Sequence, residues 1–116
     1  HNQKGNIKGD TSSSPDGIRI DPQTRLWVQT DAGTGASTTD IFGNNSQYYV
    51  DQQTGQSKRF LAGPLGCEIT GIAYTPDLTT MFINIQHPTG KWPAANLPAR
   101  SSTVVVRRTD GKPVGA

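Results

Sequence analysis

Short apolar segments recur along this chain and are separated by turn sequences, and no window shows a sustained helical period. The segments are rich in β-branched and aromatic residues, a pattern typical of β-strands. Connections such as "DPQT", "AGPLG" and "TPDLT" carry the Gly, Pro and Asp residues that tight turns require. The sequence therefore predicts an all-β fold with little or no helix, with strands at residues 17–21, 25–30, 46–51, 57–62, 68–75, 80–86 and 102–108.

Two stretches of the sequence resemble each other. "GIRIDPQTRLWVQ" begins at Gly17 and "GIAYTPDLTTMFINI" at Gly71, and both contain a Gly-Ile start, a Pro turn and an apolar strand. Their spacing is similar to the length of a four-stranded propeller blade, about 40–50 residues. We therefore expect one domain, residues 1–116, that is a partial β-propeller of about two antiparallel blades, residues 17–62 and 68–108. The second blade lacks its outer strand, and residues 1–16 precede the blades as a loop.

Composition indicates that part of the burial lies outside this chain. Only 32% of the 116 residues are hydrophobic, and there are 13 glycines and 8 prolines. A propeller normally needs about four to eight blades, so two blades leave apolar faces and strand edges for other blades or a second copy of the chain to cover. The chain starts at His1 rather than Met, and we expect it to be processed or part of a longer protein.

Charge and cysteine content exclude several classes of function. The net charge of +2 is too even for a nucleic-acid-binding surface. No apolar run approaches the 18 or so residues of a membrane span. Cys67 is the only cysteine, so it predicts neither an internal disulfide nor a cysteine-based zinc site. We interpret Cys67 as a small buried apolar residue. His87 at a strand end is expected to bond a backbone carbonyl, although it could also line a channel.

Acidic residues next to the expected innermost strands suggest a metal site. Asp16 precedes the first such strand and Glu68 begins the second, and loops at one end of a propeller converge on its channel. Oxygen-only ligands favour hard cations such as Ca²⁺. Lys8 and Asp10, in "NIKGD", could hold a phosphate and a metal ion respectively. The alternatives are a turn residue for Asp16, a solvated Glu68 and an ordinary surface loop around Lys8.

The other notable residues are assigned to the core or to a loop. Four aromatic residues are expected in the core, namely Trp27, Tyr49, Tyr74 and Phe82. Residues 30–47, "TDAGTGASTTDIFGNNSQ", are expected to form a long loop.

Several longer segments resemble a known family. "KGNIKGD", "SPDG", "DPQTRLWVQTD" and "GNNSQYYVDQQTGQSKRFLAGPLGCEITGIAYTPDLTTMFINIQHP" are similar to the C-terminal part of PhoX-type bacterial alkaline phosphatases. The resemblance implies an exported, periplasmic or secreted β-propeller enzyme that hydrolyses phosphate monoesters with calcium and iron. It also implies that Lys8 contacts substrate phosphate and Asp10 ligates calcium, with Asp16 and Glu68 at further metal positions. One departure from the family is the plain "IRI" at residues 18–20.

The same resemblance implies that the upstream part of the enzyme supplies most metal ligands, so the 116-residue segment alone is expected to be inactive. Two other functions stay open at this point. One is a calcium-dependent propeller hydrolase of the lactonase type, which would share the channel carboxylates but not need Lys8. The other is a non-catalytic propeller-like module that binds a partner through exposed strand edges.

Overall fold

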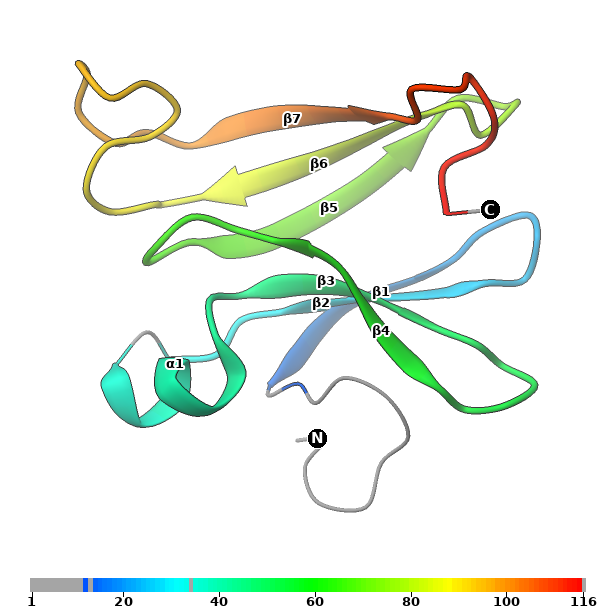
Figure 1. The fold of residues 1–116 in the computed structure, drawn as a ribbon, viewed down its shortest axis with the longest axis horizontal. Helices are drawn as coiled ribbons and strands as arrows, with labels where there is room; N and C mark the ends of the chain where they lie inside the picture. The colour runs from blue at the N-terminus through cyan, green and yellow to red at the C-terminus, as the bar shows by residue number, and fades with distance from the viewer. Residues whose placement is uncertain (1–11, 13, 34, 116) are drawn as a thin grey trace.

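The computed structural model describes residues 12, 14–33 and 35–115, which form two antiparallel sheets packed against each other (Figure 1). The first sheet has four strands in the order β1-β2-β3-β4, and the second has three in the order β5-β6-β7. Their bounds are β1 Pro15–Ile20, β2 Leu26–Thr30, β3 Ser46–Val50, β4 Ser57–Ala62, β5 Glu68–Tyr74, β6 Thr80–Gln86 and β7 Ser102–Arg107. Neighbouring strands are also consecutive in sequence, so each sheet is a simple meander. The nearly all-β prediction is confirmed.

A helix lies where a long loop was expected. Helix α1, Ala36–Phe42, occupies the connection between β2 and β3 and lies beyond the ends of these two strands (Figure 1). It begins as Gly35 accepts hydrogen bonds from the amides of Thr38 and Thr39, and it ends at Gly43, whose φ of 74° few other residues adopt. The loop prediction was wrong here because a helix this short shows too little of the helical period to be detected.

The hairpin turn between β1 and β2 is organised by a buried carboxylate. Asp21 Oδ1 accepts hydrogen bonds from the backbone amides of Gln23 (2.9 Å) and Arg25 (3.0 Å). Asp21 Oδ2 accepts from Arg25 Nε (2.7 Å) and from Trp27 Nε1 (3.0 Å). Burial acts to raise the pKa of Asp21, but these hydrogen bonds and the Arg25 charge outweigh it, so that pKa is lowered overall. The carboxylate therefore joins the turn to the core through Trp27.

The core lies between the two sheets, where β5 contacts β1, β2 and β3. Trp27 is fully buried and meets Phe60 edge-on, with ring centroids 4.9 Å apart. The buried residues of this cluster are Trp27, Cys67, Ile69, Met81, Ile83, Ile85 and Val114.

The aromatic core prediction holds for Trp27 and is wrong for Phe82, which is 37% exposed. The side chains of β6 alternate, so that Met81 and Ile83 face the core and Phe82 faces outward. Tyr49 and Tyr74 are half-buried, and the fully buried tyrosine is Tyr48.

The C-terminal segment returns to the core instead of adding a strand. The Val114 amide donates to the Leu78 carbonyl (2.8 Å), and Gly115 lies against the Trp27 ring. The second sheet accordingly has three strands among the described residues, as expected. Within the described part of the chain, no helix is long and apolar enough to cross a membrane.

Candidate metal centre

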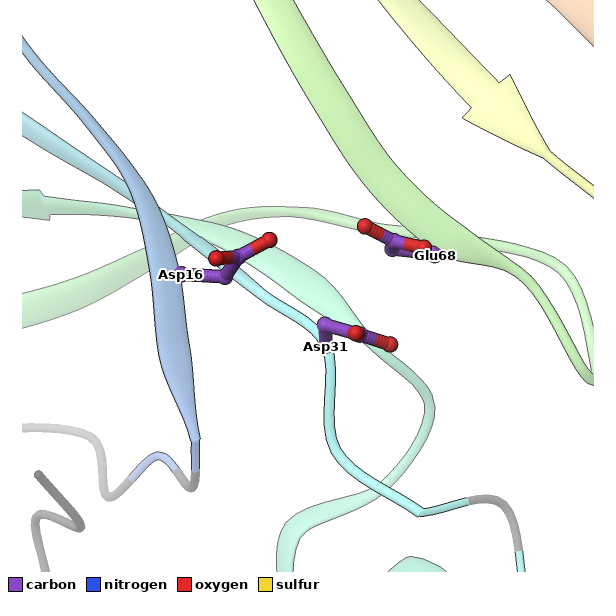
Figure 2. Close-up of side chains that lie close together, drawn as sticks. All are labelled: Asp16, Asp31 and Glu68. Carbon is purple, nitrogen blue, oxygen red and sulfur yellow. The ribbon is translucent and has the colours of Figure 1, made fainter.

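Three carboxylates meet where strands of both sheets begin or end. They belong to Asp16 on β1, Asp31 directly after β2, and Glu68 at the start of β5 (Figure 2). One oxygen from each residue lies within 4.8 Å of the corresponding oxygens of the other two. Asp16 and Asp31 are exposed, and Glu68 is half-buried. The cluster therefore opens to the surface of this chain.

Antiparallel pairing explains why Asp16 and Asp31 meet. Pro15 is opposite Thr30 in the β1–β2 register, so the start of β1 lies beside the end of β2. The Asp31 amide donates to the Ser14 carbonyl (3.1 Å) and extends this pairing by one step. The register shifts between Pro15 and Ile18, an irregularity of the kind that turns a side chain away from its regular direction.

Sheet packing adds the third carboxylate. β5 contacts both β1 and β2, and Glu68 is its first residue. Two of the three residues therefore come together within one sheet, and the third comes from the other sheet (Figure 2).

The donor set fits a hard cation. All three side chains offer oxygen, the ligand that Ca²⁺ and Mg²⁺ prefer. An ion about 2.3–2.6 Å from each ligand can bridge oxygens about 5 Å apart, and the observed spacing lies within 4.8 Å. Among the described residues, the three carboxylates form no ion pair with Lys or Arg. Like charges this close repel one another, so a bound cation would stabilise the arrangement.

His87 lies beside the cluster. Its Nε2 is 3.4 Å from Glu68 Oε2, and its Nδ1 is 3.1 Å from the Gly66 carbonyl oxygen. Hydrogen bonds with backbone carbonyls, its own first and then that of Gly66, raise the pKa of His87, and the Glu68 carboxylate adds to the effect. The expected contact of His87 with a backbone carbonyl is therefore confirmed, and the imidazole also touches one of the three acidic residues.

The structure brings together Asp16 and Glu68, the two channel carboxylates that the sequence predicted. Their role as ligands stays a prediction. Asp31 was missed, although the antiparallel β1–β2 hairpin could have revealed it, since a residue after β2 must lie near the start of β1. Lys8 and Asp10 lie outside the described residues.

Cys67 is not a nucleophile in this arrangement. Its side chain is buried, with 1% of the residue exposed, and burial raises the pKa of its thiol to about 11. The interpretation of Cys67 as a small buried apolar residue is confirmed.

Alkylation provides a test of this environment. Native full-length protein treated with iodoacetamide at pH 7.5 is expected to leave Cys67 unmodified, because the reactive thiolate is both scarce and shielded. Protein unfolded in guanidinium is expected to react fully at the same residue. Peptide mass spectrometry measures both, and rapid labelling in the native state would contradict the buried environment.

Comparison with known proteins identifies the family of this chain. The sequence model for the family "Alkaline phosphatase PhoX" matches residues 1–89. The solved structure of Pseudomonas fluorescens PhoX in complex with vanadate, a transition state analogue, is similar over 92% of this chain, with 40% sequence identity and a TM-score of 0.84. The match covers 20% of that protein, so this chain spans about a fifth of its length. No curated protein matches the chain. On these findings the chain belongs to the PhoX family of alkaline phosphatases.

Proposed function

We propose that this chain forms one side of the metal-dependent active site of an alkaline phosphatase that hydrolyses phosphate monoesters. The observation that carries the proposal is that the carboxylates of Asp16, Asp31 and Glu68 lie close together, at the ends of strands from both sheets. It is supported by the PhoX family match and by a similar structure whose protein binds vanadate, a transition state analogue.

The residues of this chain take distinct roles in the proposal. Asp16, Asp31 and Glu68 hold calcium, and Asp10 is a further calcium ligand. Lys8 binds the substrate phosphate as a positive point charge. Calcium and iron together would supply Lewis acidity and neutralise charge on the phosphate in the transition state. The three carboxylates come from separate segments of the two sheets, so the packing of the sheets sets their positions around the ion.

The two sheets are blades of a larger propeller in this proposal. Residues 17–62 and 68–108 form the two blades, residues 1–16 form an active-site loop, and the remaining blades come from the rest of the full-length protein. Ile18, Ile20 and Val105 expose 70%, 60% and 54% of their surface, and further blades would cover such apolar side chains. The 116-residue segment alone would then be inactive, and the full-length enzyme would act in the periplasm or outside the cell.

Substitution of Lys8 tests the catalytic part of the proposal. Lys8→Ala in the full-length protein is expected to lower kcat/KM for p-nitrophenyl phosphate by about 100-fold or more, because a charge that stabilises the transition state is lost. Lys112→Ala, at an exposed lysine near the end of the chain, is the matched control and should leave turnover unchanged. Unaltered turnover in Lys8→Ala would refute the role of Lys8, and lactone hydrolysis that is insensitive to Lys8 would favour the lactonase function.

A further inference from the structure

We propose that Asn45 is a positioning residue that holds Asp31 and Glu68 at the separation a metal ion needs. The inference rests on the function proposed above. Asn45 lies directly before β3, is 6% exposed, and belongs to neither of the segments that carry the two acidic residues.

The Asn45 amide makes a complete set of hydrogen bonds. Its Oδ1 accepts from the Ala32 amide (2.7 Å) and from the Thr30 hydroxyl (3.0 Å). Its Nδ2 donates to the carbonyls of Ala32 and Cys67, each at 2.9 Å. A side-chain amide has two acceptor positions and two donors, so every position is used. The amide is thereby fixed in orientation, because a rotated group would point its N–H toward that of Ala32.

These bonds reach the backbone on either side of the acidic cluster. Ala32 and Thr30 flank Asp31, and Cys67 precedes Glu68 in the chain. β2 and β5 belong to different sheets, so among the described residues no ladder of backbone hydrogen bonds joins the end of β2 to the start of β5. The buried amide of Asn45 connects the segment that carries Asp31 to the segment that carries Glu68. Farther along the two strands, Gln29 Nε2 makes a second connection to the Gly71 carbonyl (2.9 Å).

The connection extends to the linker before β5. The Gly63 amide donates to the Asn45 backbone carbonyl (2.9 Å), which anchors the chain as it leaves β4 for the second sheet. Because all positions of the Asn45 side chain are engaged, it acts through the backbone and does not itself bind the metal ion. Residues of this kind, which orient metal ligands, typically change metal affinity about 10–100-fold when replaced.

The test is the affinity of the full-length protein for calcium alone, measured by isothermal titration calorimetry without substrate. Asn45→Asp keeps the size of the side chain but replaces the NH2 group, which carries both donors, with one oxygen that faces the Ala32 and Cys67 carbonyls. We expect calcium binding about tenfold weaker or more. Thr30→Val removes one of the four Asn45 bonds, together with the contacts of the Thr30 hydroxyl to the Ser46 amide (2.9 Å) and carbonyl (3.3 Å). It is expected to weaken calcium binding less than Asn45→Asp and to keep the variant folded. Asn44→Ala is the control, since among the described residues the Asn44 side-chain amide bonds only the Gly63 carbonyl (3.0 Å), and it should bind calcium like the wild type.

Asp31→Asn distinguishes a failure of the positioning role from a failure of the proposed metal site on which it rests. If Asp31→Asn weakens calcium binding while Asn45→Asp and Thr30→Val bind like the wild type, the positioning role is wrong and the metal site stands. Lower thermal stability of the metal-free Asn45→Asp protein without weaker calcium binding would also overturn it, because that is the result of a purely structural role. If neither Asp31→Asn nor Asn45→Asp changes calcium affinity, the proposed site and the positioning role both fail.

Discussion

Replacing Glu68 with Gln in the full-length protein is expected to lower its phosphatase turnover by about 100-fold or more. Gln keeps the size of the side chain but removes one of the three negative charges that lie within 4.8 Å of one another. A weaker or displaced cation then provides less stabilisation of charge in the transition state. Initial rates with p-nitrophenyl phosphate at saturating substrate measure the loss, and Asp31→Asn should give a loss of the same order.

Two comparisons make this prediction specific to the cluster. Asp40→Asn removes an exposed carboxylate from α1 and should leave turnover unchanged. Excess calcium should partly restore Glu68→Gln if the substitution acts through metal affinity, because higher ion concentration refills a weakened site. Near-wild-type turnover in both Glu68→Gln and Asp31→Asn would remove the cluster from the catalytic site.

The second large effect is on stability, at the buried Asp21. Asp21→Ala is expected to lower the free energy of unfolding by about 3–5 kcal/mol, the usual cost of removing one partner of a buried ion pair. The substitution leaves Arg25 Nε, Trp27 Nε1 and two backbone amides without their acceptor. Chemical denaturation monitored by Trp fluorescence measures the loss.

The turn between β3 and β4 provides the matched control for Asp21. Asp51 Oδ1 accepts from the amides of Gln53 (2.8 Å) and Thr54 (3.0 Å), as Asp21 Oδ1 does in its own turn. Those bonds are exposed to solvent, and none reaches the core, so Asp51→Ala should destabilise the protein much less. Equal losses in the two variants would show that the contacts of Asp21 with Arg25 and Trp27 contribute nothing.

The stabilisation by Asp21 is expected to depend on pH in a defined direction. The pKa of Asp21 is lowered in the folded state, while an unfolded Asp titrates near pH 3.9. Its contribution is therefore fully present above about pH 4 and is lost as the pH falls through the lower native pKa. The difference in stability between the wild type and Asp21→Ala should be constant near neutral pH and should shrink in acid. A difference that grows in acid would contradict the assigned shift.

The sequence predicted the strands well because their signals are local. Each strand combines apolar alternation with a Gly, Pro or Asp turn, and β4 and β6 begin and end at the expected residues. The errors occurred where local signals were weak or ambiguous. Helix α1 is too short to show the helical period of apolar residues. Phe82 is an apolar residue that faces outward, while the residues on either side of it in β6 face the core.

The candidate metal centre was only partly predictable, for a related reason. Asp16 and Glu68 stood out because each lies at the start of an expected strand. Asp31 becomes visible only once β1 and β2 are paired in register, and Asn45 only once the two sheets are packed together. Contacts between distant segments such as these depend on tertiary structure, which single-sequence patterns do not encode.

The most direct measurement of the proposed metal site is a crystal structure of the full-length protein grown with calcium, with anomalous data to locate each ion. The account predicts an ion about 2.3–2.6 Å from oxygens of Asp16, Asp31 and Glu68, with Asn45 retaining its four hydrogen bonds. Lys or Arg side chains from elsewhere in the protein that neutralise these three carboxylates, with metal ions bound only at other residues, would contradict it.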